Sequence, residues 1–495
     1  MKNLSFLFAL GLCLPIFAHG QATDFDKAYG NRFRGREIPK TTAAGRPLDP
    51  VHRWNKVAID ATGLDHAPTD QDHVFGEQLG PGRASRAMAI VHIAIADAVS
   101  AITHRYQSYT GVQVTRVPVS LNAAIAQAAH DALVALYPSQ KAIFDADLAT
   151  DLNAIRNQIA KTNGVDLGQR VASALLALRT GDGSEIPEPV LGVDYFTSDQ
   201  PGHWRQDPIS VVPIALGAHW GECKPFVVAS NDQFRVPAPP AMTSADYTAA
   251  YNEVKSLGGD GIVTPTSRTD EQTFIGTFWA YDGTPSLCAP PRLYNQITVQ
   301  LADQRHLNIV DLARLLALMN TAMADTGMAV WESKYYWDLW RPITGIRESD
   351  PGTGPTGLGD GNDDTIGDVN FTPLGAPASN LTGPNFTPPF PAYPSGHAGF
   401  GGAIFQTLRR FFGTDNITFT FVSDEFNGIT KDNQGNVRPY MPRTFTSLSQ
   451  AEEENGQSRI YLGIHWSFDK TQGIAQGQQV ADYVFDHAFI PLHAK

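Results

Sequence analysis

The sequence is organised around residues 390–413, where a proline-rich segment ends and a helix is expected to begin. Prolines stop after Pro394, and an apolar pattern of helical period continues to Gly413. Ser395 stands at the expected helix start, where several backbone N–H groups lack intrahelical partners and the helix dipole is positive. Such a helix start can seat an oxyanion, and His397 in its first turn could exchange a proton. A capped helix with an incidental histidine explains the same residues and, for this stretch alone, is the more common case.

The rest of the chain predicts a mainly helical, all-α fold of two packed helical bundles with long Pro/Gly-rich loops. We expect an N-terminal arm at 23–83, a first bundle at 84–285 and a second at 286–495. Two alternating segments, 417–422 and 444–446, predict a minor β-hairpin. The segments of helical period are 51–62, 84–102, 120–137, 139–159, 166–178, 244–256, 269–279, 293–323 (two helices), 328–340, 449–462 and 467–485.

Residues 1–22 have the pattern of a secretory signal peptide, with Lys2, an apolar run and then small residues at the expected cleavage site. The sequence therefore predicts an exported protein, secreted or periplasmic, and no later run is expected to be long and apolar enough to span a bilayer. The net charge of −13 argues against nucleic acid or an anionic membrane as a partner. After cleavage Cys223 and Cys288 remain, and they could pair in an oxidising compartment if the fold brings them together.

Two cationic side chains, Lys334 and Arg341, stand among aromatic residues. Seven residues at about 100° each return to within about 20° of the starting direction, so we expect both on one side of a helix. A solvated face is the usual place for such a pair. The aromatic residues between them, and Trp331 one turn earlier, indicate instead that the helix is buried. Buried Lys and Arg side chains need an anion or a carboxylate as a partner.

A second cationic group follows near the end of the chain. Arg459 and His465 are six residues apart, about 120° off one face of a straight helix, so both can reach one ligand only if the helix breaks between them. Gly463 is the expected break. Asp469 lies one turn beyond His465 and could orient its second ring nitrogen.

The three groups together resemble a known superfamily. Lys334 with six residues to Arg341, then Ser395-Gly396-His397, then Arg459 with five residues to His465 form an ordered three-part signature. It is similar to that of vanadium-dependent haloperoxidases and type 2 phosphatidic acid phosphatases, including bacterial acid phosphatases. The resemblance is closest to vanadium chloroperoxidases, extends over most of the chain from about residue 84, and includes the stretches 278–283 and 290–297.

This resemblance implies a vanadate cofactor and a set of roles around it. His465 is expected to be the one protein ligand to vanadium, and His397 the acid–base residue. Asp282 is expected to support the second arginine, and Phe390 and Trp331 to flank the halide position. The remaining expected vanadate contacts are Lys334, Arg341, Arg459, Ser395 and the Gly396 backbone N–H, with Lys334 also polarising bound peroxide. The implied reaction oxidises halide (bromide and chloride) with hydrogen peroxide to hypohalous acid, which reacts with an organic acceptor.

Two other functions stay open at this point. Phosphate and vanadate are near-isosteres, so the same cradle could serve a secreted acid phosphatase with His465 as the nucleophile and His397 protonating the leaving group. A non-catalytic, oxyanion-binding periplasmic protein would need the cations but not two imidazoles. Chain length, Phe390, Trp331 and the stretch 279–283 favour the peroxidase.

Overall fold

The computed structural model describes residues 24–29, 48–71 and 73–492, so the expected signal peptide at 1–22 lies outside the described residues. Its first helices are α1 (Asp24–Tyr29), α2 (Pro50–Asp65), α3 (Gly80–Thr103), α4 (Leu121–Leu136), α5 (Lys141–Asn153), α6 (Gln158–Leu178), α7 (Ala245–Leu257) and α8 (Asp270–Phe278). They are followed by α9 (Pro291–Gln304), α10 (Ile309–Trp337), α11 (Pro342–Arg347), α12 (Gly396–Phe412), α13 (Leu448–Tyr461) and α14 (Ser467–His487). The strands are β1 (Phe419–Phe421) and β2 (Arg443–Phe445), and short 3-10 turns lie at η2 (Pro138–Gln140), η3 (Trp220–Glu222) and η4 (Asp424–Phe426).

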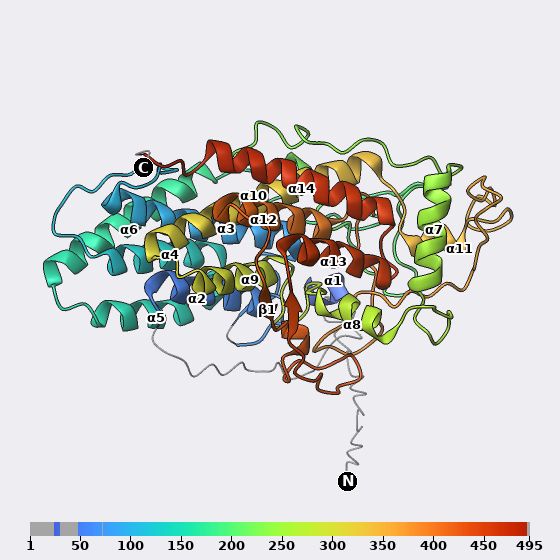
Figure 1. Ribbon diagram of the computed structural model, residues 1–495, viewed down its shortest axis with the longest axis horizontal. Helices are drawn as coiled ribbons and strands as arrows, with labels where there is room; N and C mark the ends of the chain where they lie inside the picture. Colours follow the sequence, from blue (N-terminus) through green and yellow to red (C-terminus); the bar gives the residue numbers. More distant parts are fainter. Residues whose placement is uncertain (1–23, 30–47, 72, 493–495) are drawn as a thin grey trace, which may run out of the picture.

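The predicted mainly helical fold is confirmed, and helix α10 lies at its centre (Figure 1). Helix α10 packs against α3 on one side and against α12 and α14 on the other, and α12 and α14 also pack on each other. One hydrophobic core runs through α2, α3, α4, α10, α12 and α14. The N-terminal and C-terminal groups of helices therefore share a core along α10, while the boundary at residues 285 and 286 stays a prediction.

The structure differs from the sequence prediction within α10, which runs unbroken where a break was expected between residues 323 and 328. The polar residue there, Asp325, is fully buried and accepts hydrogen bonds from the backbone N–H groups of Phe226, Val227 and Val228 at 2.6, 2.8 and 3.0 Å. A loop distant in sequence thus satisfies the carboxylate, so the helix continues through it. Similarly, α6 begins at Gln158, eight residues before its expected start, with Asn157 as its N-cap.

The predicted β-hairpin is present. Strands β1 and β2 pair antiparallel, with Phe419 opposite Phe445 and Thr420 opposite Thr444. Phe419, Phe421 and Phe445 are buried, which explains the alternating pattern. The two cysteines that could have paired, Cys223 and Cys288, are both buried free thiols.

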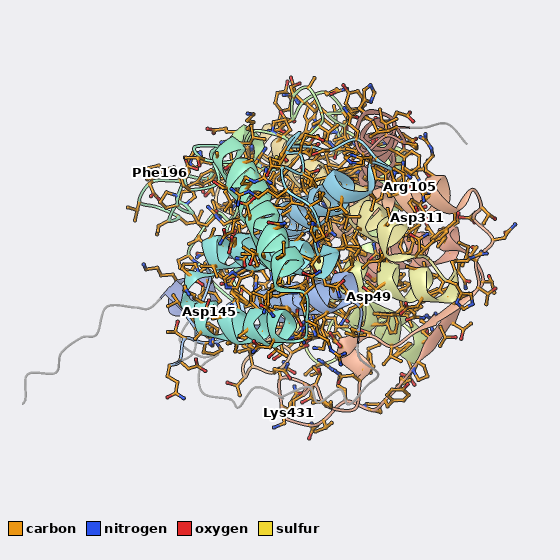
Figure 2. The ribbon with its side chains drawn as sticks, turned by 90° about the vertical axis from the view of Figure 1, so that its left-hand side faces the viewer. Asp49, Arg105, Asp145, Phe196, Asp311 and Lys431 are labelled. Carbon is orange, nitrogen blue, oxygen red and sulfur yellow. The ribbon has the colours of Figure 1, made fainter. Side chains whose placement is uncertain are left out.

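Helix α3 corrects one expectation of the sequence analysis. By length and composition it could cross a membrane, although no segment after the N-terminal one was expected to do so. In the fold, 89% of its most apolar window is buried inside the protein, against α10 and α4. Charged side chains such as Asp145 and Arg105 lie instead at the periphery of the molecule (Figure 2).

Candidate active site

The site is built at the start of α12, as the sequence predicted. Ser395 is the N-cap, and its hydroxyl oxygen accepts the Ala398 N–H at 3.4 Å. The Ser395 N–H donates to the Asp469 carbonyl oxygen at 3.0 Å, which fixes the start of α12 to the start of α14. At N1, the Gly396 N–H has no intrahelical partner because of its position in the first turn. The helix start therefore keeps free donors at a rigid junction of two helices.

Small residues let α12 and α14 approach closely behind that junction. A Cβ atom at Gly402 would lie 2.4 Å from the Ile474 carbonyl oxygen, and one at Gly477 would lie 2.0 Å from the Gly399 carbonyl oxygen. Both distances are far inside van der Waals contact. The run of small residues after His397 is thus explained by backbone packing, which holds the helix start in a fixed position.

Lys334 and Arg341 meet at the site, but not because they share a helix face. Helix α10 ends at Trp337 with Asp338 in the left-handed region, so Arg341 lies beyond its end, as the N-cap of α11. Instead, both side chains bind residues 390–392. The Lys334 Nζ donates to the carbonyl oxygens of Pro391 and Ala392 at 2.9 Å each. The Arg341 Nε donates to the carbonyl oxygen of Phe390 at 2.8 Å. The expectation that Lys334 and Arg341 share a helix face was therefore wrong, but the two side chains do lie at the same site, as predicted.

The helical segment is interrupted at Gly463, between Arg459 and His465, as predicted. Helix α13 ends at Tyr461, and Gly463 has a φ of 73° before α14 begins. A Cβ atom at Gly463 would lie 2.4 Å from the carbonyl oxygen of Gly258, so this residue provides both a left-handed turn and a close backbone approach. The turn brings His465 back toward the side of α13 that carries Arg459.

Two contacts set the tautomer of His465. Its Nδ1 lies 2.7 Å from the Asp469 Oδ2, which also accepts the Trp466 N–H at 3.0 Å. On the other side of the ring, the Arg341 Nη1 donates to Nε2 at 2.9 Å. The proton is therefore on Nδ1, and the lone pair of Nε2 points into the site. This is the form of histidine that binds a metal.

Asp282 completes the polar part of the site. Its Oδ1 accepts a hydrogen bond from the Arg459 Nη2 at 2.7 Å and lies 3.8 Å from the His397 Nε2. The same His397 nitrogen donates to the Ala280 carbonyl oxygen at 2.6 Å, so in the neutral ring Nδ1 carries the lone pair. The predicted support of the second arginine by Asp282 is present in the structure.

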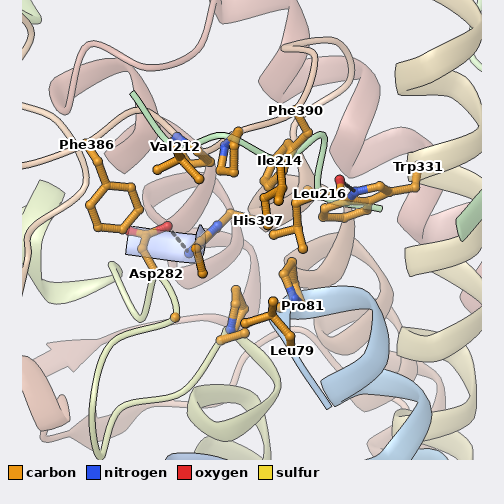
Figure 3. Close-up of a pocket in the computed structure, with 18 of the residues that line it drawn as sticks. Leu79, Pro81, Val212, Ile214, Leu216, Asp282, Trp331, Phe386, Phe390 and His397 are labelled. Atoms are coloured by element: carbon orange, nitrogen blue, oxygen red, sulfur yellow. Dashed lines mark hydrogen bonds and ion pairs between the residues drawn. The ribbon is translucent and has the colours of Figure 1, made fainter. Parts of the chain in front are cut away.

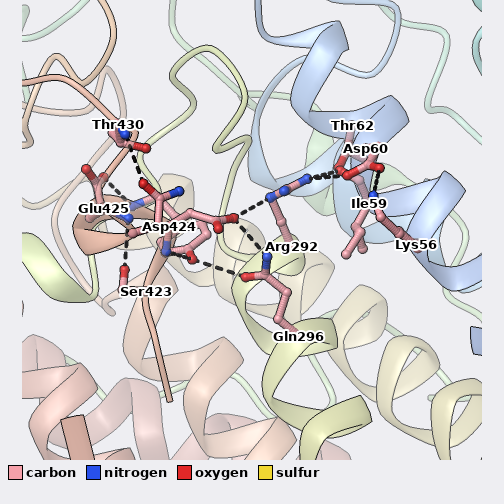
Figure 4. A network of polar contacts seen from close by, with 12 residues as sticks. Lys56, Ile59, Asp60, Thr62, Arg292, Gln296, Ser423, Asp424, Glu425 and Thr430 are labelled. Carbon is pink, nitrogen blue, oxygen red and sulfur yellow. Dashed lines mark hydrogen bonds and ion pairs between the residues drawn. The ribbon is translucent and has the colours of Figure 1, made fainter. Parts of the chain in front are cut away.

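Sequence reasoning did not predict the residues that hold the segment around Tyr281 and Asp282 in place. The Asp424 N–H donates to the Tyr281 hydroxyl at 2.6 Å, and the Glu425 Oε1 accepts the Tyr281 N–H at 3.3 Å. Behind them, the buried Arg292 of α9 donates to the Asp424 Oδ2 at 2.8 Å and to the Ile59 carbonyl oxygen of α2 at 2.6 Å (Figure 4). Arg292 belongs to the stretch 290–297 that carried the resemblance, and its isolated charge among apolar residues was the available signal.

The charges of the site call for an anion. Three buried cations, Lys334, Arg341 and Arg459, face two carboxylates: Asp469 is fully buried, and the side chain of Asp282 is 4% exposed. Among the described residues, the Arg341 Nη2 and the Arg459 Nε and Nη1 have no hydrogen-bond partner. Buried, unpaired guanidinium nitrogens are costly unless a ligand accepts their hydrogen bonds. An oxyanion supplies both the missing charge and the missing acceptors, so the residues present fit a vanadate or phosphate group.

Burial and mutual repulsion dominate the titration of these side chains. Burial, with the neighbouring charge of Arg341, holds the pKa of Lys334 well below its usual value. Burial also lowers the pKa of Arg341 to about 9, so this guanidinium stays cationic at neutral pH. Burial and the nearby cations hold the pKa of His397 and of His465 well below 6.5. Both imidazoles are therefore neutral at neutral pH in the protein without an anion.

An apolar wall stands beside the cations. The ring of Trp331 packs on that of Phe390 with centroids 4.9 Å apart, and its Nε1 donates to the Leu216 carbonyl oxygen at 3.1 Å. The Lys334 Nζ and the Arg341 guanidinium carbon lie 5.2 and 4.9 Å from the centroid of Phe390. A cavity opens from here over His397, Asp282, Arg459 and His465 (Figure 3). Of the predicted site residues, those that line this pocket are Asp282, Trp331, Phe390, Gly396, His397, Arg459 and His465.

Comparisons with known proteins agree with this geometry. Residues 314–492 match the family model of the second helical-bundle domain of vanadium chloroperoxidases. A vanadium chloroperoxidase from Curvularia inaequalis is 31% identical over 498 residues, which span 84% of this chain and 78% of that relative. The chain belongs to the vanadium-dependent haloperoxidase family. It is therefore a vanadium haloperoxidase, with vanadate as the cofactor that the cradle of cations fits.

Solved structures of bacterial vanadium enzymes share the fold of this haloperoxidase. A bacterial vanadium-dependent iodoperoxidase superposes with a TM-score of 0.68 at 22% identity, covering 91% of this chain and 100% of that one. The apo form of a bacterial vanadium-dependent chloroperoxidase superposes with a TM-score of 0.60 at 16% identity, covering 82% and 94%. Residues 24–29, 48–71 and 73–492 contain no group of three or more His, Cys, Asp or Glu that could hold a metal ion.

Proposed function

We propose that this haloperoxidase uses hydrogen peroxide to oxidise bromide and chloride to hypohalous acid. The observation that carries the proposal is the set of unpartnered, buried guanidinium nitrogens of Arg341 and Arg459 beside His465, whose Nε2 accepts a hydrogen bond from the Arg341 Nη1. One neutral imidazole and a ring of cations hold an oxyanion while leaving its other oxygens exchangeable. Bound vanadate supplies a Lewis-acidic metal that activates peroxide toward halide.

The residues of the chain divide the work around that group. The guanidinium forks of Arg341 and Arg459 match the oxygens of a tetrahedral anion, and the Gly396 N–H lies at the positive end of α12. His465 is placed to bind vanadium through Nε2 while Asp469 holds Nδ1. His397 has its Nε2 fixed by Ala280, so Nδ1 is the nitrogen left to take up or release a proton.

Beside them, the corner made by Trp331 and Phe390 suits a halide. A halide is large and weakly hydrated, so an apolar wall removes it from water at low cost, and the adjacent Lys334 and Arg341 supply a positive potential. Chloride is the smaller of the two halides and can occupy the same corner. The aromatic pair and the flanking cations therefore support chloride as well as bromide as a substrate.

The direct test is halide turnover by the purified protein loaded with vanadate. With bromide or chloride and hydrogen peroxide we expect production of hypohalous acid, and we expect added phosphate to compete because it fits the same cradle. Turnover of a phosphomonoester without vanadate, together with no halide oxidation in its presence, would instead favour the acid phosphatase.

Two substitutions test the roles of the histidines. His465→Ala removes the only expected protein ligand, so vanadium content after dialysis should fall together with activity. His397→Ala should keep vanadium but lose halide turnover, since it leaves the cradle of cations intact. Unchanged vanadium content in the first variant, or full activity in the second, would refute the corresponding role.

We also propose export of the enzyme on the basis of the signal-peptide pattern at 1–22, which N-terminal sequencing of the secreted protein would check.

A further inference from the structure

The cavity above the catalytic groups has walls of a different character from its base. Its charged and imidazole side chains, Asp282, His397, Arg459 and His465, all belong to the oxyanion site at the base. Above them the lining is aliphatic, aromatic or proline. Much of it comes from three segments far apart in the sequence, residues 79–81, 212–216 and 386–390. Figure 3 shows Phe386, Val212, Ile214, Leu216, Pro81 and Leu79 arranged around His397.

From this arrangement we propose that the cavity binds the organic acceptor itself, a small neutral molecule with an electron-rich aromatic ring, so that halogenation takes place inside the protein. The proposal rests on the proposed function, which makes hypohalous acid at the base of the same cavity. Walls without charge favour a neutral ring, because a charged ligand would lose its hydration without gaining a partner. The ring of Phe390 lines the cavity and can make aromatic contact with such a ligand.

The interior of the cavity is small, ≈ 70 Å³, and the larger space of ≈ 740 Å³ around it includes open solvent at the mouth. A bound ring would therefore lie partly in the mouth. Buried apolar walls are normally closed by side-chain packing. Here Leu79, Pro81 and Leu216 are only half-buried and present apolar surface to the cavity, beside the nearly inaccessible Val212 and Ile214. Filling that space with a ring removes apolar surface from water on both partners, which supplies the binding free energy.

The reaction in the cavity balances without a further reagent. The ring carbon attacks the halogen of hypohalous acid, and a carbon–halogen bond forms as the halogen–oxygen bond breaks. The oxygen leaves as hydroxide and takes the proton released from the same carbon, giving water. The ring is oxidised by two electrons and the halogen is reduced to the halide level. A ring held against the base of the cavity meets the hypohalous acid before it diffuses away.

Binding is tested with 3-methylindole as a neutral probe and indole-3-acetate as its charged counterpart. Saturation-transfer NMR on the vanadate-loaded enzyme, without peroxide or halide, should show contact with 3-methylindole and at least tenfold weaker binding of indole-3-acetate. Leu216→Trp fills the cavity and should weaken 3-methylindole binding at least tenfold. Val212→Phe, in the same loop, should have the same effect and serves if the first variant does not fold. Leu358→Trp is the control, because Leu358 is 61% exposed and does not line the cavity.

Turnover then separates this proposal from the proposed function. In a mixture of 3-methylindole and indole-3-acetate, the enzyme with bromide and peroxide should favour the neutral ring at least fivefold more than reagent hypobromite does, and Leu216→Trp should remove that preference. Bromide-dependent release of dioxygen from excess peroxide reports halide oxidation without an organic acceptor. Dioxygen release with a product ratio equal to that of the reagent would overturn the cavity proposal alone. Probe binding without dioxygen release would overturn the proposed function, and with it halogenation in the cavity, while leaving the binding of a neutral ring.

Discussion

The turn at Gly463 offers the sharpest test of how the backbone builds this site. Alanine there meets two separate penalties. A side chain at a φ of 73° costs about 1–2 kcal/mol of folding free energy, because Cβ crowds the following carbonyl group. In addition, the Cβ atom would lie 2.4 Å from the Gly258 carbonyl oxygen and 2.9 Å from the Pro373 Cβ, so the backbone must move. Overpacking of this kind adds about 1–3 kcal/mol.

Gly413, at the end of α12, is a matched control. It has a φ of 69°, and a Cβ atom there would meet nothing within 4 Å. Gly413→Ala therefore isolates the conformational term, about 1–2 kcal/mol, whereas Gly463→Ala carries both terms and should cost about 2–5 kcal/mol. Denaturant unfolding of the two variants beside the parent protein measures the difference.

The second measurement is vanadate affinity. The Ile464 N–H donates to the Arg459 carbonyl oxygen, and the Ile464 carbonyl oxygen accepts the Arg341 Nη1, so a shift at Gly463 moves His465 relative to both arginines. We expect Gly463→Ala to raise the dissociation constant for vanadate at least tenfold, and Gly413→Ala to leave it unchanged. Equal loss of stability in both variants, with full vanadium retention in Gly463→Ala, would refute the argument that close backbone approach positions the ligand.

Three further predictions concern the charged groups of the site. Asp282→Asn should destabilise the vanadate-free protein by about 3 kcal/mol, because it leaves Arg459 buried without a carboxylate. In unfolding experiments, added vanadate should restore part of the lost stability. An equal loss with and without vanadate would contradict this prediction. Asp469→Asn should weaken vanadate binding about 10–100-fold by releasing the His465 tautomer, and unchanged vanadium content on dialysis would count against it. In imidazole NMR titrations of the vanadate-free protein, His397 and His465 should stay neutral at pH 6, since burial and nearby cations lower the pKa of each below 6.5, so that protons bind only at lower pH. Vanadate should shift the protonation of His397 to higher pH, and a His465 resonance that titrates near pH 6.5 would show that the cations do not act on it.

The parts of the site that could be predicted are those with a local cause. The cap at Ser395, the break at Gly463 and the pairing of His465 with Asp469 each depend on a few neighbouring residues and the geometry of one helix end. Residues 390–392 show the limit of this approach. Lys334 and Arg341 were expected together because of a helix that in fact ends at Trp337, and what unites them is the carbonyl groups of that segment. Backbone carbonyl groups carry no sequence signal.

The same reason explains what sequence reasoning missed. The tie of His397 to Ala280, the support of Tyr281 by Glu425 and the walls of the cavity all join segments more than 50 residues apart. Loops such as 212–216 and 386–390 lack the periodicity that marks a helix or strand, so only the folded chain shows that they face one another. The long α10 illustrates this in the fold, since its polar Asp325 is acceptable only because residues 226–228 bind it.

The hydrogen bonds of the vanadate-free site explain how it stays ready for its cofactor. A cluster of three buried cations would repel itself apart if each side chain were free to move. Instead, Lys334 donates to two backbone carbonyl oxygens, and Arg341 donates to those of Phe390 and Ile464. Arg459 donates to Asp282. Each cation is therefore held through some of its N–H donors, and the remaining donors can bind an oxyanion. Because these anchors are backbone or carboxylate groups of other elements, an incoming oxyanion meets donors that need little rearrangement, and the repulsion already present makes its binding more favourable. Among the described residues, the Arg341 Nη1 occupies the ligating Nε2 of His465, so this hydrogen bond is an internal contact that vanadium binding would have to replace.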